Sequence, residues 1–418
     1  MGCITLPLVA FGLITYNLLS TIINPPLSPC QQSLSLINKD GSTFNVSWDF
    51  IQWLTGFADA EGNFHISLKA WTGNIFDQCQ LTFQIGLHID DIGVLRTIQS
   101  KLSCGNITIS GDKCNYYVSD IYSLYSIILP VFDAFGLNSS KIHFYAAWRK
   151  AVLILHSGSH LTQAGRLQLV TLRLAIQALV VESMPNTNFN ITPQWLLGFI
   201  EGDASFSTNN LVPRLKFENS IGDNALLLVI KAFLGVGNMG TSDRQRTANE
   251  RPTTTLEVNL CGFLFNIIIP MFANLTWYTK KRLDFEDWSI ITELYWKGYH
   301  LLPEGANLIL LLKSRMNNYR LSTDANYNGG LAISLAQIAA VYALTAPYDI
   351  YPNYRMLAGT TKFVPEGLCI TATKNSVTLE FDSLTKAGKA LHIDRTKIKN
   401  CILSSTVYKG YTFGIKVH

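Results

Sequence analysis

The sequence predicts an α+β protein built from two similar halves and a small C-terminal module. Three observations predict it. The segment Trp53–Phe64 recurs 142 positions later as Trp195–Phe206, with acids, glycine and aromatic residues in register. An alternating, strand-like pattern of apolar and polar residues follows each copy. Residues 367–418 form a separate basic stretch, with eight Lys or Arg against three Asp or Glu.

Composition limits the class of protein. Hydrophobic residues make up 48% of the 418 residues and charged ones 15%, which is typical of a folded chain and excludes extended disorder. Residues 367–418 carry a net charge of +5 and the remainder sums to −1, so the tail indicates a polyanionic partner. None of the eight cysteines forms a Cys-x-x-Cys pair, and none lies at metal-finger spacing from a histidine.

The N-terminal segment 1–46 is apolar. Ile4 to Ile23 is a run of about 20 mostly apolar residues, long enough to span a bilayer, and the first charged side chain is Lys39. No Lys or Arg precedes the run, so it resembles neither a secretory signal nor an Arg-rich transit peptide. Association of this segment with a membrane is therefore an alternative, and with it the interpretation of the chain as a membrane-anchored transport or sensor protein.

Each copy of the repeated segment is predicted to be a short helix. Apolar residues at helical spacing cover Asp49–Glu61, and Thr192-Pro193 is a cap followed by proline at the first helical position. Both helices carry two small residues four positions apart, Gly56 with Ala60 and Gly198 with Gly202. Because small residues let two backbones approach closely, we expect the two helices to pack on each other.

Glu61 and Asp203 end the two predicted helices. The carbonyl end of a helix repels an anion, so two carboxylates that converge there need cations between them, and Mg²⁺ prefers oxygen ligands of this kind. A two-metal site of this type suits phosphodiester hydrolysis. Asp59 and Glu201 lie two residues earlier and are expected to support packing or solvation instead.

The residues after the two acids differ. Gly62 follows Glu61 and can adopt the left-handed turn that ends a helix, whereas Ala204 follows Asp203 and resists it. We therefore expect a distorted second half-site and weakened double-strand cleavage.

The strands after each helix have one apolar and one polar face. A curved antiparallel sheet with such a polar face fits the major groove of DNA, where Arg, Lys and Gln can bind base edges. A merely solvated face is the alternative for any single residue. The residues predicted to contact DNA are His65, Lys69, Gln80, Gln84, Arg214, Lys216, Arg244 and Arg246.

Later landmarks repeat as well. Gly105-Asn106-Ile107 corresponds to Gly237-Asn238-Met239, and Lys141 lies seven residues before Trp148 as Lys281 does before Trp288. Together with the two motif copies, these residues resemble the LAGLIDADG homing endonucleases in their double-motif, intron-encoded form. The resemblance covers about residues 47 to 323.

The resemblance implies a fold, a site and a location. It implies two pseudo-symmetric αββαββα-type repeats, at 47–186 and 187–325, with paired motif helices and antiparallel sheets facing double-stranded DNA. It assigns Mg²⁺ or Mn²⁺ to Glu61 and Asp203, and electrostatic stabilisation of the scissile phosphates to Lys141 and Lys281. It also implies a monomer with internal pseudo-two-fold symmetry, encoded in the mitochondrion, and a closing helix over Leu308–Asn317. For the apolar segment 1–46 it implies an exon-like origin, by read-through from an upstream membrane-protein exon, and such a segment would be cut off or dispensable.

Residues 326–366 are a linker without an assigned structure, and 367–418 form the C-terminal module. The pattern there predicts a strand, two helices and a returning strand at Val377–Phe381, Ser383–Leu391, Arg395–Leu403 and Tyr408–Phe413. Lys397 and Lys399 on the second helix suit a helix-turn-helix laid in a groove. This unit resembles the nuclease-associated modular DNA-binding domain, and a basic protein-contact module is the alternative.

The sequence thus predicts a site-specific DNA endonuclease that hydrolyses phosphodiesters with divalent metal. Glu61→Gln or Asp203→Asn should abolish cleavage and leave DNA binding largely intact. The alternative is an RNA maturase that binds its host group I intron and assists splicing with little or no DNA cleavage. The same scaffold could perform this function, and the distortion expected at Ala204 slightly favours it.

Overall fold

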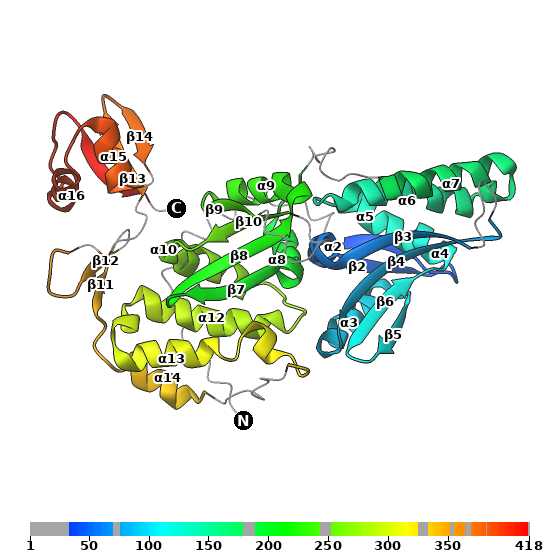
Figure 1. The fold of residues 1–418 in the computed structure, drawn as a ribbon, viewed down its shortest axis with the longest axis horizontal. Coiled ribbons are helices and arrows are strands. Elements are labelled where there is room, and N and C mark those ends of the chain that lie inside the picture. Colours follow the sequence, from blue (N-terminus) through cyan, green and yellow to red (C-terminus); the bar gives the residue numbers. More distant parts are fainter. Residues whose placement is uncertain are drawn as a thin grey trace.

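The computed structural model describes most of the chain after residue 32. The described ranges are 33–69, 76–178, 189–242, 252–324, 333–351, 355–362, 364, 369–381 and 383–416. Two repeats of similar architecture lie side by side, with helices α2 and α8 at the centre, and the C-terminal module follows (Figure 1).

The first repeat contains a helix, a four-stranded sheet and covering helices, preceded by a hairpin. Its elements are β1 (Ser33–Ile37), β2 (Thr43–Ser47), α2 (Trp48–Glu61), β3 (Gly62–Lys69), β4 (Gln78–His88), η2 (Ile89–Asp91), α3 (Ile92–Leu102), β5 (Asn106–Ser110), β6 (Lys113–Val118), α4 (Ile121–Ser123), η3 (Leu124–Ile128), α5 (Leu129–Phe135), α6 (Lys141–His156), η4 (Ser159–Leu161) and α7 (Gln163–Ala178).

The second repeat follows the same order without the hairpin. Its elements are α8 (Pro193–Asp203), β7 (Ala204–Asn209), β8 (Val212–Ser220), η6 (Ile221–Asp223), α9 (Asn224–Leu234), β9 (Asn238–Ser242), β10 (Thr253–Val258), α10 (Cys261–Phe263), η7 (Leu264–Ile268), α11 (Ile269–Ala273), α12 (Lys281–Trp296), η8 (Tyr299–Leu301), α13 (Pro303–Lys313) and η9 (Asn317–Arg320).

The two sheets share one topology. Both are antiparallel, with strand order β3-β4-β6-β5 in the first repeat and β7-β8-β10-β9 in the second. The strands alternate as predicted, because Phe64 and Phe206 are buried in their cores while the residues between the apolar positions face outward. Helices α6 and α12 pack against the inner faces of the two sheets (Figure 1). The predicted α+β class and pseudo-symmetric repeats are confirmed.

The hairpin β1–β2 was not predicted. Leu36 and Val46 are 1% and 3% exposed and belong to the main hydrophobic core. The folded body therefore begins before Ser47, the residue at which the sequence analysis placed the start of the first repeat. The apolar run Ile4–Ile23 lies outside the described residues. Among the residues that the structure describes, no helix combines the length and apolar character needed to cross a bilayer.

The region after the second repeat contains the short elements α14 (Leu335–Tyr342), β11 (Tyr348–Ile350) and β12 (Arg355–Leu357), where no structure was assigned from sequence. Arg355 is 2% exposed. Its guanidinium lies 4.2 Å from the ring centre of Trp296 and donates to the carbonyl oxygens of Tyr295 and Trp296 at the end of α12. Cations stabilise the carbonyl end of a helix, so this segment is anchored to the second repeat.

The C-terminal module has its own core. Its elements are β13 (Cys369–Lys374), β14 (Val377–Phe381), α15 (Leu384–Leu391), α16 (Arg395–Ser404) and β15 (Thr412–Lys416). The strands form an antiparallel sheet in the order β14-β13-β15, and Ile370, Ala387 and Ile398 form part of a separate hydrophobic cluster.

Two predicted elements have different bounds. The returning strand is β15 and not Tyr408–Phe413, because Lys409 and Gly410 have φ of 51° and 79° and form a turn. The closing helix α13 ends at Lys313 instead of Asn317, whose φ of 57° is incompatible with an α-helix.

Candidate active site

The seam between the repeats is formed by α2 and α8. A Cβ atom added to Gly56 would lie 2.0 Å from the carbonyl oxygen of Trp195, and one added to Gly198 would lie 2.0 Å from that of Trp53. The backbones touch at both glycines, so no larger residue fits there. The predicted packing of the motif helices through small residues is confirmed.

Glu61 and Asp203 lie at the same end of this helix pair. A Cβ on Gly202 would be 3.2 Å from Cγ of Glu61. Both carboxyls are partly buried. Burial raises the pKa of Glu61, and the nearby charge of Asp203 raises it further. Burial also raises the pKa of Asp203, which Lys141 and Lys281 oppose. The two acids therefore meet at one seam, as the sequence analysis predicted.

Two lysines hold the ends of the motif helices. The ammonium of Lys141 donates to the carbonyl oxygens of Ala60 at 2.5 Å and Ala58 at 3.3 Å. That of Lys281 donates to the carbonyl oxygens of Ala204 at 2.6 Å and Ile200 at 3.1 Å. Burial lowers the pKa of each lysine, while the surrounding carboxylates oppose that shift. Each ammonium thus offsets the partial negative charge of a helix end beside the acids.

Asp59 forms the link between the first motif helix and α6. Its carboxylate accepts from the backbone N–H groups of Asn138 and Ser139, both at 2.8 Å, and from the indole N–H of Trp195 at 2.9 Å. Burial raises the pKa of Asp59 to about 6, although these donors favour the charged form. Asp59 therefore fixes the turn directly before the helix that carries Lys141.

Glu201 repeats this arrangement in the second half. It accepts from the N–H groups of Tyr278 at 3.0 Å and Thr279 at 2.6 Å, and from the indole N–H of Trp53 at 2.5 Å. Burial raises its pKa as well. The structure thus supports the packing role expected for Asp59 and Glu201. Each of these two acids also accepts a hydrogen bond across the seam from a tryptophan of the other repeat.

A second pair of acids crosses the seam and was missed from sequence. Asp91 accepts from the N–H of Lys280 at 2.9 Å, and Asp223 accepts from the N–H of Ser140 at 2.7 Å. Each acid belongs to one repeat and binds the N-terminal turn before the lysine helix of the other. The only signal in the sequence is that both precede a helix, α3 or α9, at equivalent positions.

The predicted distortion after Asp203 is wrong. Gly62 has φ −73° and ψ 149°, and Ala204 has φ −100° and ψ 160°, so both are extended and begin a strand. Neither needs the left-handed conformation, and Ala204 fits with 3% of its surface exposed. Glycine is needed at position 62 for another reason, because a Cβ there would lie 2.7 Å from the carbonyl oxygen of Ala58.

The predicted DNA-contacting residues of the first sheet share one face. His65, Lys69 and Gln80 are exposed at alternate positions of β3 and β4. Gln84 is partly buried and donates to the side-chain oxygen of Asn115 at 3.0 Å. These side chains therefore lie on the solvent face of the sheet whose first strand, β3, directly follows Glu61.

The corresponding cations of the second sheet are paired. Arg214 binds Glu257 at 3.1 Å and Lys216 binds Glu218 at 2.6 Å. Arg244 and Arg246 lie outside the described residues. In the C-terminal module, Lys397 and Lys399 are on α16, and the ammonium of Lys397 lies 4.9 Å from the ring centre of Tyr408.

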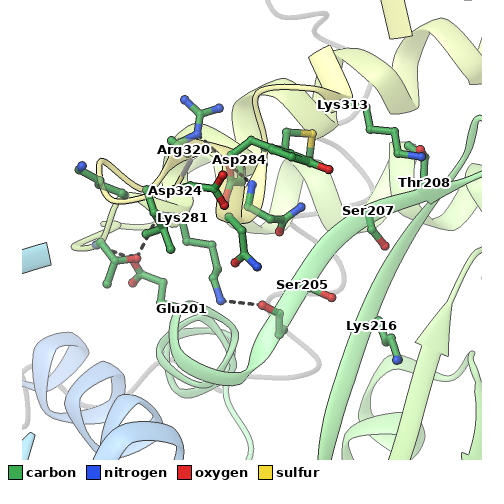
Figure 2. Close-up of a pocket in the computed structure, with 18 of the residues that line it drawn as sticks. Glu201, Ser205, Ser207, Thr208, Lys216, Lys281, Asp284, Lys313, Arg320 and Asp324 are labelled. Carbon is green, nitrogen blue, oxygen red and sulfur yellow. Dashed lines mark hydrogen bonds and ion pairs between the residues drawn. The ribbon is translucent and has the colours of Figure 1, made fainter. Parts of the chain in front are cut away.

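A cavity of about 840 Å³ adjoins the second half-site. Lys281 and Glu201 lie on one side of it, and Ser205, Ser207 and Lys216 lie on the sheet (Figure 2). Residues of the segment after α13, from Met316 to Asp324, line the remaining side of this cavity.

The donor set at the seam fits a hard divalent cation. It consists of two carboxylates, and the side-chain oxygen of Asn219, beside Asp203, is buried without a hydrogen-bond partner in the described part of the chain. Oxygen ligands of this kind suit Mg²⁺ and similar ions. Within the described ranges, no cluster of three or more His, Cys, Asp or Glu side chains forms a closed protein cage for a metal.

The described repeats form a pseudo-symmetric nuclease body. It combines paired motif helices, two sheets that each have one solvent face, and two acids at a shared seam. A profile of the LAGLIDADG endonucleases matches residues 54–152 and 196–292, which are the two repeats. The chain belongs to the LAGLIDADG endonuclease family, a class of DNA-cutting enzymes.

Relatives agree with this assignment. The chain is 26% identical to an uncharacterized mitochondrial protein, RF1, of Saccharomyces cerevisiae. The alignment of 403 residues covers 89% of this chain and 82% of that protein. It is 24% identical to the probable intron-encoded endonuclease 3 of Neurospora crassa, over 66% of this chain and 56% of the relative. The relatives place the protein in the mitochondrion.

Solved structures show the same fold. The homing endonuclease I-GzeII in complex with its DNA target is 26% identical, with a TM-score of 0.55 over 65% of this chain and 99% of that one. I-SmaMI, bound to an uncleaved DNA target in the presence of calcium ions, is 25% identical with a TM-score of 0.55, over 64% of this chain and 98% of the other.

Proposed function

We propose that this protein is a site-specific homing endonuclease that hydrolyses both strands of a double-stranded DNA target with divalent metal. The observation that carries the proposal is the meeting of Glu61 and Asp203 at the seam, each at the end of a motif helix and each beside a partly buried lysine. Both half-sites lie in one chain, so a monomer suffices.

The two acids are the proposed metal ligands. The nearby charge of Asp203 raises the pKa of Glu61, and a bound cation would remove that repulsion. When bound, Mg²⁺ or Mn²⁺ supplies Lewis-acid stabilisation of the attacking and leaving oxygens of the phosphodiester. The related enzyme I-SmaMI is bound to an uncleaved DNA target in the presence of calcium ions, which supports the use of a divalent ion by this fold.

The two lysines are the proposed electrostatic stabilisers. Lys141 and Lys281 hold their ammonium groups beside the acids through backbone carbonyls. A fixed positive charge next to the scissile phosphate stabilises the negative charge that develops there, and removal of one such donor typically costs about 10²–10³ in rate.

The sheet faces are the proposed DNA-reading surfaces. His65, Lys69 and Gln80 are exposed, and Gln84, Arg214 and Lys216 are already paired within their sheets. The paired side chains must exchange these partners for base edges or phosphates, so we expect them to contribute specificity more than affinity. We propose that residues 367–418 form a DNA-binding module, with Lys397 and Lys399 contacting phosphates.

Substitution of the two acids tests this proposal. Glu61→Gln and Asp203→Asn keep the shape of each side chain and remove its charge, so cleavage should fall below detection while DNA binding is retained. Asp49→Asn is the matched control, because Asp49 is an exposed acid in the first turn of α2. Substrates would be selected from a randomised duplex library. Unchanged nicking by the double variant would remove both acids from the mechanism.

The maturase remains the alternative for the same scaffold. The feature of the sequence that favoured the maturase was the distortion expected at Ala204. The backbone of Ala204 is extended and undistorted. Binding of the host intron RNA that survives loss of both acids, without cleavage of the intronless DNA, would favour it over the endonuclease.

A further inference from the structure

The C-terminal module carries lysines and tyrosines together at one end. The ammonium groups of Lys397 and Lys409 lie 4.9 Å and 6.0 Å from the ring centre of Tyr408, and that of Lys374 lies 5.0 Å from the ring centre of Tyr411. All three lysines are exposed. Aromatic rings hold these cations in place without neutralising them, because a ring carries no net charge. These five residues form the basic cluster of the module.

The basic cluster brings three elements of the module together. Lys397 is on α16, Lys374 ends β13, and the turn from Tyr408 to Tyr411 precedes β15. Backbone hydrogen bonds of 3.0 Å and 2.9 Å between the two tyrosines close that turn. Fixed lysine charges on one rim of a small domain suit the phosphates of a DNA backbone, which position a protein on the duplex without reading its sequence.

The segment before the module is fixed to the second repeat. Arg355 in β12 is 2% exposed and donates to the carbonyl end of α12. Tyr348 in β11 packs on Gly298, where an added Cβ would lie 2.8 Å from the tyrosine ring. The backbone N–H of Val364 donates to the carbonyl oxygen of Arg355 at 3.0 Å. The hairpin β11–β12 therefore anchors the chain as far as Val364.

A short stretch of chain separates this anchor from the module. Cys369, the first residue of β13, follows Val364 by five positions. An extended chain spans at most about 3.6 Å per residue, so β13 begins within about 18 Å of the anchor. Since successive phosphates of a strand are about 3.4 Å apart along the duplex axis, this reach corresponds to about five base pairs. The anchor therefore limits where on a duplex the module can bind.

The anchor lies far from the seam. Helix α12 starts at Lys281, beside the two acids, and ends at Trp296, where Arg355 binds. A helix of 16 residues is about 24 Å long. In Figure 1, α12 runs from the seam toward the end of the molecule opposite the first repeat, and the module lies at that end.

We propose that the basic cluster binds phosphates on the outer flank of the second half-site, which is the DNA beyond that half-site on the side away from the seam. The anchored hairpin fixes the spacing between the half-site and this flank. The bound DNA is then longer on the side of the second repeat than on the side of the first. This inference rests on the proposed binding of a DNA target and does not require cleavage.

Footprinting tests which flank the module binds. A duplex selected for binding from the randomised library would be probed with hydroxyl radicals in Ca²⁺, with the full-length protein. Lys69→Ala and Lys216→Ala mark the two sides, because each removes a proposed contact of one sheet. The double variant Lys397→Ala, Lys409→Ala should lose protection beyond the second half-site. Loss on the side of the first half-site, or no loss, would overturn the inference.

Salt dependence tests whether the basic cluster binds phosphates. Loss of one phosphate contact lowers the slope of log affinity against log salt by about 1, so Lys397→Ala and Lys409→Ala should each lower it by that amount. Lys389→Ala is the matched control, because Lys389 is exposed on α15 outside the basic cluster, and it should keep the wild-type slope. Equal slopes in all four proteins would overturn the inference.

A longer tether tests the fixed spacing. Insertion of about five base pairs between the second half-site and its outer flank turns the flank to the opposite face of the duplex, and the wild type should bind this duplex at least about tenfold more weakly. A variant with about twelve Gly and Ser residues inserted after Val364 gains roughly 19 Å of reach. It should bind both duplexes within about threefold of each other. Equal sensitivity of the two proteins to the inserted base pairs would overturn the inference.

These outcomes separate the inference from the nuclease function. If the wild type cuts its duplex and the protected DNA is equally long on both sides of the cut, the inference fails and the nuclease proposal stands. If the longer flank is found on a duplex that the wild type binds in Mg²⁺ without cutting, the nuclease proposal fails and the inference stands.

Discussion

Gly198→Ala tests how closely the two motif helices must approach. The added Cβ would lie 2.0 Å from the carbonyl oxygen of Trp53 and 2.8 Å from the backbone nitrogen of Phe57. Both neighbours are backbone atoms, which cannot rotate away as a side chain could. A non-bonded contact of about 3 Å requires the helices to separate by roughly 1 Å, at a cost of about 1–3 kcal/mol.

This separation has two measurable results. At about 2–4 °C per kcal/mol, the melting temperature should fall by about 2–12 °C. Because the helices end at Glu61 and Asp203, the acids should also move apart, and a misplacement of about 1 Å costs roughly 10²-fold in rate. DNA binding should change much less than cleavage, since the sheets lie outside the contact.

Gly93→Ala is the matched control. Gly93 lies in helix α3, and nothing lies within 4 Å of an added Cβ there. This variant should be about 0.5–1 kcal/mol more stable, since alanine favours the helix. Calorimetry and single-turnover cleavage would be measured on both variants. If Gly198→Ala had the melting temperature and the cleavage rate of the wild type, the close approach of the two helices would be refuted.

Three further predictions concern individual side chains. Lys281→Met should lower cleavage about 10²–10³-fold with DNA binding retained, measured by nicking and gel shift; an undiminished rate would exclude Lys281 from the chemistry. Burial lowers the pKa of His300 to about 4 from its ordinary value near 6.5, so stability should be full above pH 6.5 and fall as the pH drops toward 4. His300→Gln should flatten that slope in denaturation curves, and an identical slope would count against it. Arg320→Ala leaves the buried carboxylate of Asp284 without its ion pair and should lower the free energy of unfolding by about 3–5 kcal/mol. Arg282→Ala breaks an exposed ion pair and should lower it by less than about 1 kcal/mol. Equal losses for the two variants in urea unfolding would contradict this reasoning.

Repetition explains which parts of the site could be predicted from sequence. Glu61 and Asp203, and Lys141 and Lys281, recur in register, and a feature that occurs twice at one spacing is difficult to attribute to ordinary surface residues. The close packing at Gly56 was predicted for the same reason.

Residues that act across the seam, or in one half only, could not be predicted. Asp91 binds the N–H of Lys280, 189 positions away, and no local pattern marks such a partner. Asn219 has no polar counterpart in the first repeat, so comparison of the halves does not reveal it. The error at Ala204 came from the assumption of a left-handed helix end, whereas the strand begins directly and needs only extended backbone.

Anomalous diffraction can show whether Glu61 and Asp203 hold the catalytic metal. Crystals of the protein with a duplex that it cleaves would be grown in Mn²⁺, and the anomalous peaks compared with the two acids. We expect manganese within about 2.0–2.3 Å of carboxylate oxygens of both Glu61 and Asp203. Manganese that contacts neither carboxylate, in crystals where the DNA is cut, would contradict it.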